Sequence, residues 1–91
     1  MNIDKEVSKM YNRHLDDIFS GSRKGKLPEA RFLIWYLHNA VNKKSSLELE
    51  SIYGWDDSTI RFGIMKTKDR IKYYPSFRER VLSLEYQLKN N

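Results

Sequence analysis

The chain has 91 residues, no cysteine, and 17 lysine and arginine residues against 12 aspartate and glutamate residues, a net charge of +5. This length allows one small domain, because such a chain buries only about 60 to 65% of the surface that its unfolded form exposes. The lack of cysteine excludes disulfides and thiolate catalysis, and no apolar run approaches the roughly 20 residues of a membrane span. We therefore expect a cytoplasmic protein without membrane contact, and the excess of cations favours a polyanionic partner.

Apolar residues at helical spacing predict a leading helix and a short helical turn over residues 1–19. Ile3, Val7 and Met10 follow one face of the helix, and Leu15 and Ile18 mark the turn. Residues 20–26 contain two glycines, two serines and three cations and no apolar side chain. We therefore expect an exposed basic loop over residues 20–27.

A central helix is predicted for residues 28–41, with Pro28 in its first turn. Its apolar residues form one buried stripe, which consists of Leu33, Ile34, Leu37 and Val41. Three aromatic residues thicken this stripe, and on so apolar a helix they favour core packing over stacking on unpaired bases. They are Phe32, Trp35 and Tyr36.

A short helix, a tight turn and a longer helix are predicted for residues 45–74. Ser45 and Glu48 have the spacing of a capping box, and Gly54 can end the short helix in the left-handed conformation. Asp56 or Asp57 can cap the longer helix. The inner face of the longer helix then carries Ile60, Gly63, Ile64, Thr67 and Ile71, and the glycine permits the close approach of a neighbour.

The last amphipathic helix is predicted for residues 76–91. Pro75 ends the preceding helix, and Ser76 and Glu79 repeat the capping-box spacing. No segment has the strict alternation of a half-buried strand. The expected fold class is all-α, a compact bundle of five to six helices.

The helix that begins near Asp57 allows two interpretations. Ser58, Phe62 and Lys66 share one exposed face, and the proportions of the two helices favour a helix-turn-helix whose second helix enters the DNA major groove. Equally well supported is a structural role, in which the acids and hydroxyls cap the helix and the cations form a solvated face.

The segments ARFLIWYL, SLELESIYG and GWDDSTI, in this order, resemble the C-terminal DNA-binding domain of DnaA, the bacterial replication initiator. IDKEVSKMYNRHLDDIFSGSRK is similar to the opening helix, short turn and basic loop of that family, so the resemblance covers nearly the whole chain. It implies a Trp-repressor-like helix-turn-helix in a non-enzymatic, nucleoid-associated protein. Double-stranded DNA is the implied partner, together with other replication proteins.

The resemblance also implies individual site residues. Arg23 matches an arginine that enters the minor groove, and Asp56, Ser58 and Thr59 match the family's DHSTV-like signature at the base edges. Lys66 matches a downstream lysine, and Phe62 joins the major-groove face. Further phosphate contacts are expected from other cations, namely Lys24, Lys26, Lys43, Lys44 and Arg61.

Two departures from the family predict altered specificity. Asp57, which belongs to the expected DNA-binding set, stands where the family has histidine, and Trp55 replaces a Gly-Arg pair. Attraction to DNA is thereby lost and repulsion is added. An alternative is a protein-interaction module that keeps the fold without DNA readout, which an exposed apolar patch around Trp55 and Phe62 would favour. No metal or cofactor is expected, because His14 and His38 lack carboxylates at metal-ligand spacing and GSRKGKL has no strand before it.

Overall fold

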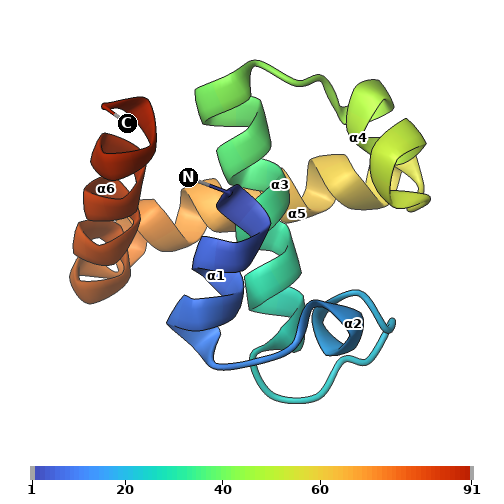
Figure 1. The fold of residues 1–91 in the computed structure, drawn as a ribbon, viewed down its shortest axis with the longest axis horizontal. Helices are drawn as coiled ribbons and strands as arrows, with labels where there is room; N and C mark the ends of the chain where they lie inside the picture. Colours follow the sequence, from blue (N-terminus) through green and yellow to red (C-terminus); the bar gives the residue numbers. More distant parts are fainter. Residues whose placement is uncertain (1, 91) are drawn as a thin grey trace.

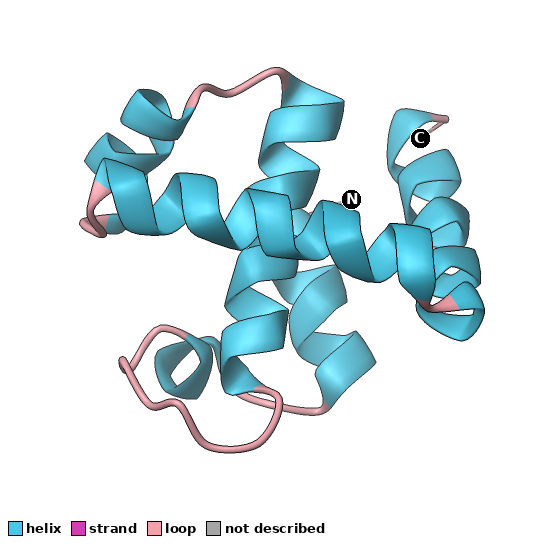
Figure 2. Ribbon diagram, turned by 180° about the vertical axis from the view of Figure 1, so that it is seen from behind, coloured by secondary structure: helices cyan, strands magenta, loops and turns pink. Residues whose placement is uncertain are grey.

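The computed structural model describes residues 2–90, and within them it contains helices and no strands, which confirms the all-α class. The six helices are α1 (Ile3–Tyr11), α2 (Leu15–Ile18), α3 (Leu27–Asn42), α4 (Ser46–Tyr53), α5 (Asp57–Tyr73) and α6 (Pro75–Lys89). Helix α3 stands in the middle with α1 beside it, α4 near one end of α5, and α6 at the other (Figure 1). Seen from behind, α5 crosses the front of α3 (Figure 2). None of the described helices combines the length and apolar composition that a bilayer crossing requires.

The ends of α4 and α5 follow the predicted caps. The Ser45 hydroxyl accepts the Glu48 N–H at 3.1 Å, and the Glu48 carboxylate accepts the Ser45 N–H at 3.2 Å. Gly54 ends α4 at φ 74°, the left-handed region that glycine enters without a Cβ clash. Asp56, rather than Asp57, caps α5 by accepting the Ser58 N–H at 3.1 Å. These local rules place a three-residue turn between the two helices.

The predicted start of the last helix was wrong by one residue. Helix α6 begins at Pro75 after Tyr74, which makes no side-chain cap, so the expected capping box of Ser76 and Glu79 does not form. Proline suits the first helical position because its φ is already helical and it has no N–H that needs an acceptor. Ser76 therefore lies inside the first turn.

The core lies where α5 crosses α3. Trp35 is fully buried, which confirms its predicted core role, and Phe32 and Tyr36 are half-buried at the edge of the core. Helix α5 contributes Ile60 and Ile64 to the core, and the other helices contribute further buried apolar side chains, which are Ile3, Val7, Ile18, Leu49, Val81 and Leu84. The predicted inner face of α5 is therefore largely confirmed.

Gly63 sits at the crossing itself and has no room for a side chain. A Cβ atom there would lie 2.5 Å from Cδ1 and 2.9 Å from Cγ of Phe32, and 3.0 Å from Cε3 of Trp35. One turn later, the buried Thr67 hydroxyl donates to the Gly63 carbonyl at 3.0 Å. This bond satisfies the only polar group of the Thr67 side chain. The two helices can therefore approach closely only because residue 63 is glycine.

A polar cluster fastens α4 to α1 and α3. The Tyr53 hydroxyl donates to the Asp4 carboxylate at 2.8 Å, and Asp4 also lies 2.9 Å from Nε2 of His38. Burial first, and then the Asp4 charge, raise the pKa of Tyr53, so its hydroxyl stays protonated as a donor at neutral pH. This cluster holds the helix before the turn in place.

We expect Gly63→Ala to destabilise the protein, although alanine is the better helix former by about 1 kcal/mol. Overpacking against Phe32 and Trp35 typically costs about 1 to 3 kcal/mol, and each kcal/mol lowers Tm by roughly 4 to 8 °C in a domain of this size. Thermal unfolding followed by circular dichroism measures this change. In a Phe32→Ala background most of the loss should disappear, and an undiminished loss would contradict the steric explanation.

Candidate nucleic-acid interface

The structure brings four predicted site residues to one hollow of about 500 Å³. Arg23 comes from the basic loop, and Ser58, Thr59 and Phe62 come from the first two turns of α5. The remaining wall consists of Pro28, Arg31, Phe32 and Trp55. We call this the loop–α5 hollow. Its lining combines two arginines, two hydroxyls and three aromatic side chains.

Arg31 is the site residue that sequence reasoning missed. It is only 4% exposed, and its Nη1 donates to the carbonyls of Ile18 and Ser22, both at 3.0 Å. Its guanidinium also lies 4.8 Å from the centre of the Trp55 ring, within cation–π distance. Arg31 therefore ties α2 and the basic loop to the start of α3. The available signal was a cation inside the apolar segment ARFLIWYL.

The electrostatics of the hollow link Arg31 to Arg23. Burial first, and then the positive charge of Arg23, lower the pKa of Arg31. Arg31 nevertheless stays charged at neutral pH, because the ordinary pKa of a guanidinium lies far above neutrality. Among the described residues, Nε of Arg31 is buried and has no acceptor. Two cations thus share one hollow, and this arrangement favours an anionic ligand.

The start of α5 adds one carboxylate and two hydroxyls. Hydrogen bonds from the Ser58 hydroxyl and N–H lower the pKa of Asp56, with a smaller contribution from Arg61. Asp56 is therefore ionised at neutral pH, and it lies exposed at the helix N-terminus. Ser58 is exposed and Thr59 is half-buried at the rim of the hollow, so both hydroxyls can reach a ligand.

Asp57 lies on the α4 side of the helix and does not line the loop–α5 hollow. Its carboxylate is 3.0 Å from the Arg61 guanidinium and accepts the Ser46 hydroxyl, while its N–H donates to Glu50 at 2.7 Å. Asp57 thus links α4 to the start of α5. The same carboxylate pairs with Arg61, which was predicted to contact a DNA phosphate.

Trp55 packs inward rather than forming an exposed apolar patch with Phe62. Its ring meets the Trp35 ring at an angle of 62°, with the centroids 5.5 Å apart, and it is half-buried. Phe62 is 49% exposed, and the Lys66 ammonium lies 5.8 Å from its ring centre. Of the two aromatic residues, only Phe62 offers a large exposed surface.

The other predicted cations divide between two ends of α3. Lys24 and Lys26 are exposed in the basic loop, near the N-terminus of α3. Lys43 and Lys44 follow its C-terminus, where Lys43 bonds the Ala40 carbonyl at 3.1 Å and Lys44 lies 3.7 Å from Glu48. Figure 1 places these two ends far apart. The structure therefore does not bring Lys43 and Lys44 to the loop–α5 hollow.

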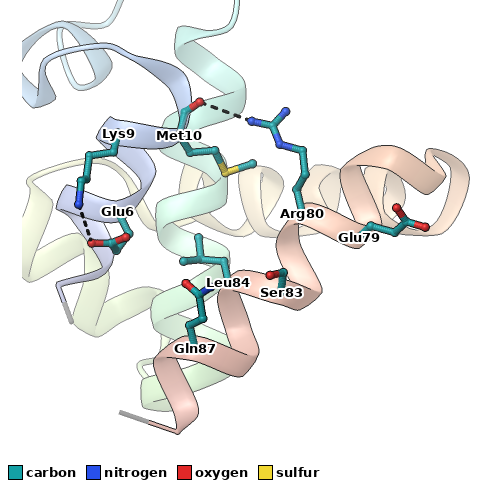
Figure 3. A pocket seen from close by; sticks show the side chains of 8 residues that line it. All are labelled: Glu6, Lys9, Met10, Glu79, Arg80, Ser83, Leu84 and Gln87. Atoms are coloured by element: carbon teal, nitrogen blue, oxygen red, sulfur yellow. Dashed lines mark hydrogen bonds and ion pairs between the residues drawn. The ribbon is translucent and has the colours of Figure 1, made fainter.

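A second hollow, of about 520 Å³, lies between α1 and α6 (Figure 3). Its charges are of mixed sign, because Glu6 pairs with Lys9 at 3.6 Å and Glu79 lies on the same rim as Arg80. It contains none of the predicted site residues. This α1–α6 groove has no concentration of charge of one sign to match that of the loop–α5 hollow.

No protein-family model, curated protein or solved structure matches this chain. The resemblance to the DnaA domain therefore remains a prediction from the sequence.

We expect Arg31→Met to release the basic loop. The Ile18 and Ser22 carbonyls lose their donor, and each buried carbonyl left unpaired costs about 1 to 3 kcal/mol. The free energy of unfolding should fall by roughly 2 to 3 kcal/mol, and amide exchange at residues 20–26 should accelerate. Arg23→Ala is the matched control, and as a surface change it should stay within about ±0.5 kcal/mol. Equal effects of the two substitutions would show that Arg31 does not hold the loop.

Proposed function

We propose that this protein binds double-stranded DNA and has no enzymatic activity. The observation that carries the proposal is the meeting of Arg23 with Ser58, Thr59 and Phe62 at the loop–α5 hollow. These residues come from two segments that are separated in the chain by more than the whole of α3. A cationic loop beside the polar start of a helix is suited to contact a duplex backbone and a groove at the same time.

In this proposal, α4, the turn 54–56 and α5 act as a helix-turn-helix. The first two turns of α5 enter the major groove, where the Ser58 and Thr59 hydroxyls reach base edges and Lys66 holds phosphate. Arg23 enters the neighbouring minor groove, and Lys24 and Lys26 bind the backbone. The resemblance to the DnaA domain supports these roles, and replication-origin binding is the biological context that it suggests.

The sequence preference should differ from that of the DnaA family. Asp56 is an ionised carboxylate at the start of the helix, and such a group accepts from the cytosine amino group and repels phosphate. The chain lacks the family's Gly-Arg pair before it, and Asp57 is bound to α4. Recognition of base edges by this end of α5 would therefore use fewer hydrogen-bond donors than in the DnaA family.

A protein-interaction module is the second candidate. Leu47 and Ile52 on α4 are 66% and 57% exposed, and Met65 on α5 is half exposed. Exposed apolar side chains of this size favour contact with another protein over contact with phosphate. This candidate requires that the chain does not bind duplex DNA, and the next experiment tests that requirement.

Duplex binding should depend strongly on salt. If the basic loop and α5 neutralise about 4 to 6 phosphates, log affinity should fall against log salt with a slope of roughly −4 to −5. The slope can be measured by fluorescence anisotropy with a labelled random-sequence duplex. The salt concentration should run from about 50 to about 200 mM, the range over which phosphate contacts weaken strongly. A flat profile, or no binding at low salt, would favour the protein-interaction module.

Arg23→Ala should weaken duplex binding more at A·T-rich flanks than at G·C-rich flanks. A narrow A·T minor groove has an enhanced negative potential that an inserted arginine exploits. Lys24→Ala should weaken binding to all sequences about equally, as expected for a phosphate contact. Lys89→Ala removes a cation at the far end of α6 and serves as the matched control. A loss in Arg23→Ala that ignores the flanking sequence would assign this arginine to the backbone.

A further inference from the structure

A third hollow, of about 380 Å³, lies where the start of α3, the end of α5 and the start of α6 meet. We call it the α5–α6 hollow. Its polar lining includes Lys26, Glu29, Arg70, Tyr74, Ser76 and Arg80. Except for Lys26, none of these residues belongs to the predicted DNA-binding set. Three cations therefore face one carboxylate in a partly enclosed space.

The carboxylate of this hollow, Glu29, already has two partners within the protein. Glu29 lies 3.7 Å from Nε of Arg70 and accepts the Tyr11 hydroxyl. The pKa of Tyr11 is raised, by burial first and then by Glu29, while the charges of Arg80 and Arg70 act in the opposite direction. Both arginines therefore lie close to this pair. Three positive charges and one negative charge leave the hollow with a net charge of about +2.

Several donors of the residues that line the hollow have no acceptor within the described part of the chain. Nη1 of Arg70 is buried and unpaired, and the first turn of α6 has no side-chain cap. The Arg80 guanidinium makes one long bond, 3.4 Å to the Met10 carbonyl, and extends from α6 across the α1–α6 groove (Figure 3). Its other nitrogens remain available to a ligand.

The carbonyls that could compete for these donors are taken by another residue. Arg78 donates to the Ile71 carbonyl at 2.8 Å and to the Lys72 carbonyl at 2.7 Å, so it covers the C-terminal end of α5. Without this cover, the negative end of the α5 dipole would attract Arg70 and Arg80. Arg78 thus occupies two carbonyls that could otherwise accept hydrogen bonds from the unpaired nitrogens of Arg70 and Arg80.

We propose that the α5–α6 hollow binds a phosphate group through Arg70, Arg80 and Lys26. Arginine forks match the oxygens of phosphate, and the uncapped turn of α6 adds backbone donors at its positive end. The ligand is either free phosphate or a phosphodiester of the DNA backbone. Only the second source depends on the proposed function.

The position of the hollow suits both sources. Arg70 follows Phe62 by eight residues, which corresponds to about 12 Å along α5, and Lys26 belongs to the same basic loop as Arg23. A duplex held at the loop–α5 hollow would therefore need to extend only a short distance to place a phosphate here. Free phosphate can enter without any duplex, because the hollow opens to solvent beside the exposed Arg80.

The test uses the full ¹⁵N-labelled chain and two probes, sodium phosphate and a short duplex, at ionic strength matched with sodium chloride. The readouts are the NMR signals of the Ser76 and Phe77 amides and of Nε–H of Arg70.

Arg70→Gln should raise the Kd of the bound probe by about tenfold or more, because hydrogen bonds to charged groups are lost. Arg80→Gln tests the same hollow without disturbing the Arg70–Glu29 pair, in case Arg70→Gln does not fold. Lys89→Gln is the control for loss of one charge on α6.

Saturable shifts with phosphate that weaken in Arg70→Gln or Arg80→Gln, but not in Lys89→Gln, would support a free-phosphate site. The same pattern with the duplex alone would support a backbone phosphodiester. No shift with either probe, or equal weakening in Lys89→Gln, would overturn the proposal. Arg23→Ala separates it from the proposed function, since it should weaken the duplex and leave phosphate unchanged. If phosphate binds at the α5–α6 hollow and the duplex does not bind, the result contradicts the proposed function and supports the phosphate site.

Discussion

The close contact of α5 with α3 at Gly63 determines where the candidate binding residues of α5 lie. Because residue 63 has no side chain, the α5 backbone rests on the rings of Phe32 and Trp35. The start of α5 then falls beside the basic loop, and its end falls beside α6 (Figure 2). A helix held further from α3 would separate Ser58 and Thr59 from Arg23, so packing in the core sets the geometry of the surface.

Arg31 connects the basic loop to helix α3. Residues 20–26 of the basic loop have no apolar side chain, and the loop nevertheless has a defined path because a buried guanidinium donates to the Ser22 carbonyl. Burying a cation is costly unless it is hydrogen-bonded, and here two carbonyls and the Trp55 ring offset the cost. Trp55, in the turn between α4 and α5, thus serves as a partner for this arginine.

The acidic and basic side chains are distributed unevenly over the surface. Three of the acids have partners within the protein: Asp57 pairs with Arg61, Glu29 engages Arg70 and Tyr11, and Asp4 bonds His38 and Tyr53. The cations of the basic loop and of Arg80 have no such carboxylate partners among the described ion pairs. An excess of positive charge therefore gathers along one side of α5, at both of its ends.

The sequence by itself determined the helices, the capping box of Ser45 and the left-handed Gly54, because each depends on neighbours within a few residues. It indicated that Gly63 permits a close approach, but only the tertiary structure decided that the neighbours there are Phe32 and Trp35. The sequence misplaced the start of α6, since proline at the first position and a capping box at Ser76 are competing local signals. Only the tertiary structure decided that Asp57 turns toward α4, that Arg31 is buried and that Arg70 meets Arg80. These outcomes depend on contacts between residues distant in the chain, and a pattern of spacing carries no information about which distant groups will meet.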